Sequence, residues 1–372
     1  MLISSPCLPL PKSTRLTRYL LKRFLNSIAI LWGVVTLLFI LFSLIPGDAS
    51  RLLVGQRSDK KSLELIQKDL GLDQPKAVQY LAFLNDLSPI SVHSTDSLSF
   101  FYLSKAKYGE PASVEIGNVV VAFKAPYLRR SYQSQKPVTE IISETFPNTL
   151  ILAIASMIFA SILGIFLGLV CGLKKDSWFD KAALVFTSFG MALPSFFAAI
   201  LIAWLFAYKL GDYTGLSLTG NLWEIDDFGN GPYLQLQNLI LPALTLGIRP
   251  LAVVLQLTRS SLLDVLSQDY IRTAKAKGLN TRQIVWRHGL KNSLNPVVTG
   301  ISGWFASMMA GVIFIEYIFG WKGLGYIVVD ALNSYDLPVV NGCVLTISLI
   351  FIVVNLLVDF AYTLIDPRIQ LS

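Results

Sequence analysis

Six long apolar runs limit what this chain can fold into more than any other feature of its sequence. A bilayer core of roughly 30 Å is crossed by about 20 apolar residues in a helix. The runs that meet this length are residues 24–45, 150–173, 182–208, 239–257, 297–318 and 339–364. Composition agrees, because 53% of all residues are apolar and only 15% are charged, whereas soluble domains have about 25% charged residues. The sequence therefore predicts an all-α polytopic membrane protein with six transmembrane helices.

The first and fourth runs differ from the others. Run 24–45 follows a basic segment, residues 1–23, as the apolar part of a secretory signal peptide would. It is too long for such a peptide and is not followed by a small-x-small cleavage site, so we expect it to remain as a helix. Run 239–257 is the weakest of the six, because it is short and contains Arg249.

Lysine and arginine in the short loops predict the orientation of the chain. They gather in residues 1–23, in the loop that follows residue 173 and in residues 258–296, whereas the loops 209–238 and 319–338 hold one lysine each. Cytoplasmic loops of membrane proteins carry such an excess of positive charge. Six spans place both termini on the same side, so we expect N- and C-termini in the cytoplasm. The net charge of +7 is then an orientation signal and does not indicate nucleic-acid binding.

The long first external segment, residues 46–149, has structural signals of its own. Its first part shows helical spacing of apolar residues, and β-branched and aromatic residues become frequent beyond residue 87. We interpret residues 88–135 as a small external β-rich insert. The expected elements are a helix at 62–70, a helix whose first turn holds Pro75, and strands at 97–103 and 118–123.

Glycines recur at every fourth position of the second span, at Gly164, Gly168 and Gly172. Such G-x-x-x-G spacing allows two membrane helices to approach closely. Packing inside the bundle and a subunit interface are both compatible with this pattern.

Motifs for catalysis and metal binding are absent from the sequence. It contains no G-x-x-x-x-G-K-[ST], H-E-x-x-H, G-x-S-x-G or EF-hand loop, and its carboxylates in the spans are isolated. Histidine occurs only at His93 and His288, which argues against a multi-histidine metal site. The cysteines Cys7, Cys171 and Cys343 form no C-x-x-C pair, and we expect them to be small buried hydrophobes. We therefore predict no catalytic residues, no metal site and no cofactor in this chain.

The loop 258–296 is nearly forty residues long, too long for a passive link between neighbouring spans. It is helix-prone before Gly278, which can end a short helix, and Asn280 or Thr281 can cap the next one. A small apolar face among its charges consists of Tyr270, Ile271, Ala274 and Leu279. This face predicts either a helix docked in a partner's groove or a basic amphipathic segment on anionic lipid.

Several motifs in this order resemble the dipeptide/oligopeptide permease family of ABC importers. The loop RTAKAKGLNTRQIVWRHGLKNSL resembles the cytoplasmic "EAA" loop of such permeases. The chain also has the family-like elements LIPGDAS, LGLDQPKAVQYLAFL, FPNTLILA, GVIFIEYIFGWKGLG, YDLPVVNG and NLLVDFAYTLIDPRI. Together they place about 300 of the 372 residues, in 18–87 and 136–371, along the family pattern.

Three features depart from that pattern. The EAA consensus has Glu-Ala-Ala where this chain has Arg272, Thr273 and Ala274, a replacement usual for the peptide-permease branch. The insert 88–135 has no counterpart in the family, and Arg249 inside a span is atypical.

The resemblance implies a type I ABC-importer permease fold, with residues 150–372 as the permease core. It also implies the partners: a second, homologous permease subunit, two cytoplasmic ATPase subunits that bind ATP and Mg, and an external substrate-binding protein. The chain would lie in the bacterial cytoplasmic (inner) membrane as a non-catalytic subunit. A short coupling helix would contact the ATPase through Tyr270, Arg272, Ala274, Lys275, Lys277, Gly278 and Leu279.

Polar side chains within the spans are candidates for the translocation pathway. Arg249 faces either a substrate carboxylate or a partner within the bundle. Glu316 contributes either to an external gate or to the turn before Gly320 and Trp321. Asn355, one helical turn from Asp359, lines the pathway or forms hydrogen bonds inside the bundle.

A peptide importer is the leading functional hypothesis. An importer of nickel chelates, glutathione, sugar-like or other small solutes keeps the class and changes the cargo. An ion-coupled secondary transporter would need no ATPase, and the long EAA-like loop argues against it, as it does against a membrane scaffold or receptor.

Overall fold

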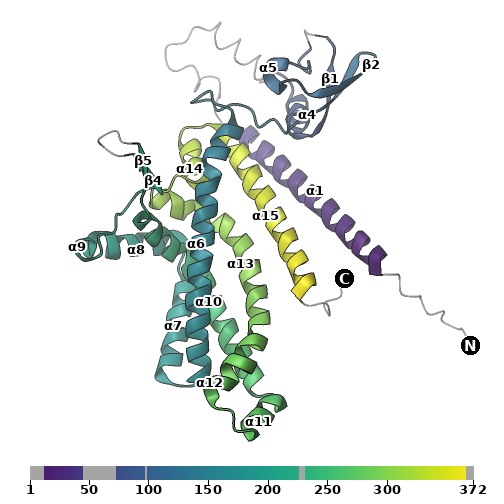
Figure 1. The fold of residues 1–372 in the computed structure, drawn as a ribbon. Coiled ribbons are helices and arrows are strands. Elements are labelled where there is room, and N and C mark those ends of the chain that lie inside the picture. Colours follow the sequence, from purple (N-terminus) through teal and green to yellow (C-terminus); the bar gives the residue numbers. More distant parts are fainter. Residues whose placement is uncertain (1–11, 45–72, 97–98, 226–230, 366–372) are drawn as a thin grey trace, which may run out of the picture. The chain divides into compact units, whose positions relative to one another are not determined.

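The computed structural model describes residues 12–44, 73–96, 99–225 and 231–365 (Figure 1). Helices make up most of these residues. In chain order the elements are α1 (Lys12–Leu44), α4 (Lys76–Leu87), β1 (Ile90–Ser94), α5 (Lys105–Tyr108), β2 (Ala112–Ile116), β3 (Val119–Phe123), α6 (Val138–Leu173), α7 (Trp178–Ala192), α8 (Ser195–Ile202), the π-helix η1 (Ala203–Lys209), α9 (Gly211–Thr214), β4 (Trp223–Ile225), β5 (Pro232–Leu234), α10 (Gln237–Leu266), α11 (Asp269–Ala276), α12 (Thr281–Ile284), the π-helix η2 (Val285–Gly289), α13 (Leu290–Ile318), α14 (Leu324–Asn333) and α15 (Leu337–Ile365).

The chain divides into two units. The first, called the helical unit here, comprises residues 1–27, 145–326 and 347–372. The second, called the mixed unit, comprises residues 28–144 and 327–346.

Helix α10 is the centre of the helical unit. It lies against α13, α7 and α8, and α13 also contacts α8. Apolar side chains from α6, α8, α10 and α13 form most of the main core, which includes the fully buried Trp321. Its buried members include Leu152, Met157, Ala199, Leu241, Leu246, Met308, Val312, Ile315 and Phe319.

The glycine stripe of α6 packs inside this unit, against α10. A Cβ atom on Gly168 would lie 2.6 Å from Cβ of Thr258 and 2.7 Å from the carbonyl oxygen of Leu255. Gly164 and Gly172 have similar close neighbours on α10. Of the two alternatives, close packing within the bundle is therefore the one observed.

Four helices are long and apolar enough to cross a membrane, in α1, α6, α10 and α15. Two further pairs qualify as bent spans, which raises the number in the described residues to as many as six. One pair bends by 58° within α13. The other consists of α7 followed by α8 and η1, and bends by 113°. The run 182–208 is therefore interrupted at its proline, because Pro194 has no backbone N–H and forces Leu193 into an extended conformation.

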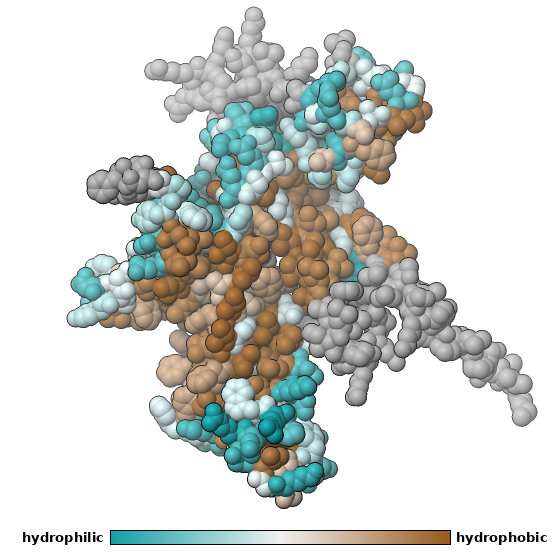
Figure 2. Space-filling model, viewed as in Figure 1, coloured by the Kyte–Doolittle hydropathy of each residue, from teal (hydrophilic) through white to brown (hydrophobic). Residues whose placement is uncertain are grey.

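Apolar side chains also cover the outside of these helices. Residues such as Ile162 on α6 and Phe186 on α7 are 68% and 76% exposed. Figure 2 shows this apolar surface in brown along the helical unit, with polar surface in teal at the end that carries α11 and α12. Such a surface suits lipid or a partner subunit.

The mixed unit contains the expected β-rich insert. Strand β3 lies between β1 and β2 in an antiparallel sheet, with Val121 opposite both Val92 and Val114. The predicted strand at 118–123 is confirmed as β3. Residues 97 and 98 of the strand predicted at 97–103 lie outside the described residues. The rest of that prediction is wrong, because residues 99–104 form turns with one isolated bridge, and the strand beside β3 is β1, in which Ser91 and His93 are buried.

Helix α4 begins directly after Pro75, as the sequence predicts. Cys171 and Cys343 are buried, and neither forms a disulfide among the described residues. Cys7 and the helix expected at 62–70 lie outside the described residues.

The close approach of α6 and α10 gives a stability prediction. Replacing a glycine inside a helix with alanine normally stabilises the helix by roughly 0.5–1 kcal/mol. Gly168→Ala should instead lower the free energy of unfolding by about 1–3 kcal/mol, because its Cβ overlaps Thr258 and the Leu255 carbonyl. Thermal unfolding of the purified chain measures the effect. Gly303→Ala on α13, with no atom within 4 Å of its new Cβ, is the matched control. Equal midpoints for the two variants would contradict the packing argument.

Candidate functional site

The break between α7 and α8 is the first element of the candidate translocation site. Helix α7 ends before Leu193, which is extended because Pro194 follows it, so the Leu193 carbonyl group does not point along a helix axis toward an N–H group of the next turn. Arg249 of α10 donates a hydrogen bond from Nη2 to this carbonyl oxygen at 2.8 Å. Backbone groups inside a bilayer must find such partners within the protein. Arg249 therefore stabilises the break.

A cavity of about 290 Å³ lies beside this break. Its lining residues are Gly190, Leu193, Ser195, Ala198, Thr245, Leu246, Ile248, Arg249, Pro250, Trp304, Ser307, Met308, Gly311 and Ile315. Arg249 is the only charged residue among them. Its Nε atom is buried and has no hydrogen-bond partner among the described residues. The guanidinium group thus keeps an unused donor beside an otherwise largely apolar cavity.

Helices α11 and α12 occupy the turn between α10 and η2, at the lower end of Figure 1. Gly278 follows α11 with φ of +80°, a left-handed conformation that suits glycine. Asn280 then begins α12 with a reciprocal capping box: its Oδ1 accepts from the Gln283 backbone N–H at 2.8 Å, and its own N–H donates to Gln283 Oε1. Both the helix end and the cap agree with the sequence analysis.

The apolar face of this segment is turned inward. Ile271, Ala274 and Ile284 form a small core of their own, with Leu266 and Leu279 packed against it. Ala274 is only 6% exposed. Ile271 and Ala274 are thus covered by the chain's own α12, and docking of this segment in a partner's groove stays a prediction.

The outward face of α11 is polar and cationic. Arg272, Lys275 and Lys277 are exposed, and Tyr270 is 42% exposed while its hydroxyl oxygen accepts a hydrogen bond from Asn292. Asp269 of the same helix is also exposed and forms an ion pair with Arg272 at 3.2 Å.

Glu316 lies in a corner that joins α13 to α14. It is fully buried, and its Oε2 accepts hydrogen bonds from the backbone N–H groups of Gly325 at 2.7 Å and Tyr326 at 3.2 Å. Added Cβ atoms on Gly323 or Gly325 would collide with its carboxyl group. Nearby, the Trp321 indole donates to the carbonyl oxygen of Asn148 at 2.9 Å. The carboxylate thus caps the first turn of α14, which favours the structural alternative over a gate.

Asn355 forms a hydrogen bond within its own helix. Its side-chain amide donates to the carbonyl oxygen of Phe351 at 2.8 Å. It is not among the residues that line the cavity beside Arg249. The side chain of Asp359 lies outside the described part of the structure.

Sequence reasoning missed a buried ion pair between α7 and α10. Asp180 is 1% exposed, and its two carboxylate oxygens accept hydrogen bonds from Nε and Nη2 of Arg259 at 2.6 and 2.7 Å. Ser177 caps α7 by accepting a hydrogen bond from the Asp180 backbone. The S-x-x-D spacing could have located this helix start, although nothing in the sequence pairs Asp180 with Arg259, 79 residues away.

Two parts of the chain match known protein families. Residues 160–371 match the family described as "Binding-protein-dependent transport system inner membrane component", and residues 16–96 match its N-terminal companion. The chain therefore belongs to the family of membrane permeases of binding-protein-dependent transport systems.

Two relatives are similar over nearly the whole chain. The dipeptide transport system permease protein of Alkalihalophilus pseudofirmus is 32% identical over 366 residues, covering 95% of this chain and 99% of that protein. The glutathione transport system permease protein of Escherichia coli K12 is 33% identical over 352 residues, covering 95% and 98%. Among solved structures, a chain of the MetNI methionine ABC transporter aligns with a TM-score of 0.48 and 14% identity, covering 61% and 97%.

The buried corner around Glu316 gives a prediction that separates its two roles. Glu316→Ala leaves the N–H groups of Gly325 and Tyr326 without their acceptor, so the free energy of unfolding should fall by roughly 2–4 kcal/mol. Glu316→Gln keeps one carbonyl acceptor and should cost less. The exposed Glu140→Ala should change stability by less than about 1 kcal/mol. If Glu316→Ala had the same free energy of unfolding as the unchanged protein and yet blocked transport, the residue would be a gate and not a cap.

Proposed function

We propose that this chain is one permease subunit of an ATP-driven importer for short peptides, and that it forms half of the translocation pathway. The observation that carries this proposal is the similarity, over nearly the full length of both chains, to dipeptide and glutathione transport permeases. Glutathione is itself a small peptide, so the two relatives share a class of cargo. The missing P-loop is consistent with ATP and Mg bound on separate ATPase subunits.

The proposed orientation places α11 and α12 in the cytoplasm. Residues 258–296 carry seven basic and two acidic side chains, and residues 1–23 carry five basic side chains and no acidic one. The positive-inside rule supports a cytoplasmic position for both segments and for both termini. An external binding protein would then meet the opposite side, and a second, homologous permease would complete the pathway.

Coupling to the ATPase would occur through the outward face of α11. Its exposed cations would contact acidic groups of the partner, while the Ile271–Ala274–Ile284 core would keep α11 fixed on α12. Closure of two ATPases would then displace the segment and the attached α10 and α13 as a unit. Rigid-body rotation of this kind is a common way to connect distant sites.

Recognition of the cargo would involve Arg249. A peptide carries a carboxylate at its C-terminus, and an anion in a low-dielectric cavity needs an opposite charge or hydrogen-bond donors. The unused Nε donor of Arg249 and the adjacent cavity of about 290 Å³ meet this need. Arginine also binds carboxylates with defined geometry.

The direct test is co-purification of the chain followed by uptake in proteoliposomes. The proposal requires a stable complex with an ATPase and a second permease, and ATP-dependent uptake of di- or tripeptides. Uptake without an ATPase would indicate an ion-coupled transporter. Competition by nickel chelates or sugars, with no competition by peptides, would retain the importer and reject the peptide cargo.

Charge reversal on α11 tests the coupling surface. Arg272→Glu together with Lys275→Glu should reduce ATP-dependent uptake by about tenfold or more, because like charges would face the acidic partner. Both side chains are exposed, so unfolding of the permease should not change. Lys209→Glu is the control, because Lys209 is an exposed cation at the end of η1, outside the segment 258–296. It should leave uptake unchanged. Normal uptake by the double variant would exclude this face from coupling.

Removal of the charge at Arg249 tests cargo recognition. Arg249→Gln should raise the KM for uptake of a dipeptide by about tenfold, the value of one charge-assisted hydrogen bond. The same dipeptide with an amidated C-terminus should show little change, since it has no carboxylate to lose. Arg249→Lys should recover part of the effect. An equal loss for free and amidated peptides would show that Arg249 acts only by stabilising the α7–α8 break.

A further inference from the structure

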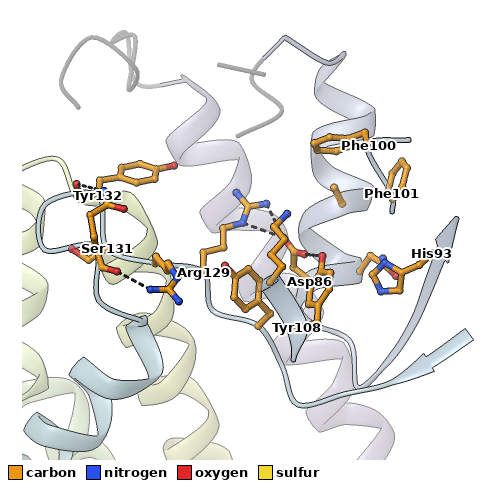
Figure 3. A pocket seen from close by; sticks show the side chains of 14 residues that line it. Asp86, His93, Phe100, Phe101, Tyr108, Arg129, Ser131 and Tyr132 are labelled. Carbon is orange, nitrogen blue, oxygen red and sulfur yellow. Dashed lines mark hydrogen bonds and ion pairs between the residues drawn. The ribbon is translucent and has the colours of Figure 1, made fainter. Parts of the chain in front are cut away.

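The insert of the mixed unit encloses a cavity of about 350 Å³, which is large enough for a small ligand. Its walls come from α4, β1, α5, the turn at Phe100 and Phe101, and residues 127–135 (Figure 3). No function described above uses this cavity. Three of its lining residues, Ala82, Asn85 and Asp86, belong to α4, and the others lie between residues 93 and 135.

Aromatic rings form much of the cavity wall. The lining includes Phe100, Phe101, Tyr108, Tyr127 and Tyr132. Tyr108 contacts Tyr127 edge-to-face, with ring centroids 5.3 Å apart, and lies 5.0 Å from the ring of His93. Figure 3 shows Phe100 and Phe101 on one side of Asp86, and Tyr132 on the other. Rings held against each other in this way offer an apolar surface that is already ordered before a ligand binds.

The one acid among the described lining residues, Asp86, is already neutralised. Arg129 donates to its Oδ2 from Nε at 3.1 Å and from Nη2 at 3.0 Å, and the Tyr108 hydroxyl donates to Oδ1 at 2.7 Å. Burial, and secondly the Asp86 charge, raise the pKa of Tyr108, so this hydroxyl keeps its proton. Asp86 is only 3% exposed and is therefore not available to attract a cationic ligand.

The remaining charges in the wall are positive. Lys107 and Arg130 line the cavity in addition to the paired Arg129, and both are exposed. Lys124 adds a cation behind the wall, with Nζ 5.0 Å from the centre of the Tyr108 ring. Burial lowers the pKa of His93, so its imidazole is neutral near pH 7 and adds no charge. Aromatic walls with this excess of positive charge disfavour a cationic ligand and favour an anionic one.

We propose that this cavity is a binding site for a molecule that carries an aromatic ring and a carboxylate, of the kind found at the C-terminus of a peptide ending in Phe or Tyr. The ring would pack against Tyr108, Tyr127 and the adjacent phenylalanines, and the carboxylate would bind Lys107 and Arg130. The choice of a peptide end over other aromatic anions rests on the proposed function. The site itself rests on the geometry of the insert.

Binding is measured by equilibrium dialysis on the full chain, purified with its partners in lipid nanodiscs. The first probe is N-acetyl-L-phenylalanine. N-acetyl-L-phenylalaninamide, without a carboxylate, and N-acetyl-L-alanine, without a ring, should both bind at least about tenfold more weakly. L-Phenylalanine and L-alanyl-L-phenylalanine then distinguish a free amino acid from a peptide end, and the proposal requires that the dipeptide binds better.

Two lysines on the same helix provide a matched pair of variants. Lys107→Gln combined with Arg130→Gln should weaken binding of N-acetyl-L-phenylalanine by about tenfold or more. Lys105→Gln, on α5 but outside the cavity and paired with the exposed Glu110, should leave it unchanged. Ala82→Leu, which fills the cavity from α4, should reduce binding of every aromatic probe.

The outcomes separate this site from the transport function. Three results would overturn the site, whatever the uptake assay shows. They are equal binding of N-acetyl-L-phenylalanine and its amide, equal binding by the Lys107→Gln/Arg130→Gln and Lys105→Gln variants, and no binding at millimolar concentration. Binding that follows the predicted order supports the site even if peptide uptake fails. Failure of ATP-dependent uptake with binding intact would reject only the proposed cargo.

Discussion

A hydrogen bond between a charged side chain and a backbone carbonyl allows this permease to interrupt a helix inside its apolar bundle. The carbonyl oxygen of Leu193 would be costly without a partner, because lipid offers no donor. Arg249 supplies that donor from α10. The same interaction fixes the position of the guanidinium group beside the cavity, so a structural requirement and the proposed recognition of an anion depend on one residue. The hydrogen bond lies at the break where the chain bends by 113° after α7.

Elsewhere in the helical unit, close contacts hold α10 against α6 and α7. The glycine stripe of α6 lets the backbone of α10 approach, and the Asp180–Arg259 pair joins the first turn of α7 to the far part of α10. Replacing either partner of a buried ion pair leaves an uncompensated charge, so such pairs hold two elements in one arrangement. α10 is thus fixed by contacts along its length, and the cavity lies where α7, α8, α10 and α13 meet.

Much of this architecture was predictable from local sequence patterns, whereas the angles and pairings were not. Apolar runs located the spans, Pro75 and Gly278 located helix ends, and the alternation at 118–123 located β3. The Asp180–Arg259 pair and the cap at Glu316 depend on residues that meet only in the folded chain. The position of the break in the third span follows from Pro194, whereas its angle does not. The strand expected at 97–103 failed for a related reason, because composition indicates strand propensity but not which segment lies beside β3. Arg249 was recognised as unusual from sequence, but its partner was not.

The internal core of α11 and α12 has a mechanical consequence. Ile271 and Ala274 rest on Ile284, and the capping box at Asn280 fixes the start of α12, which continues through η2 into α13 without a loop. We expect α11, α12 and the start of α13 to move together as one unit. A displacement of α11 would therefore be passed to α12 and through η2 to the start of α13. In the proposed importer, movement would enter this chain at α11, whereas ATP would be hydrolysed on a separate subunit.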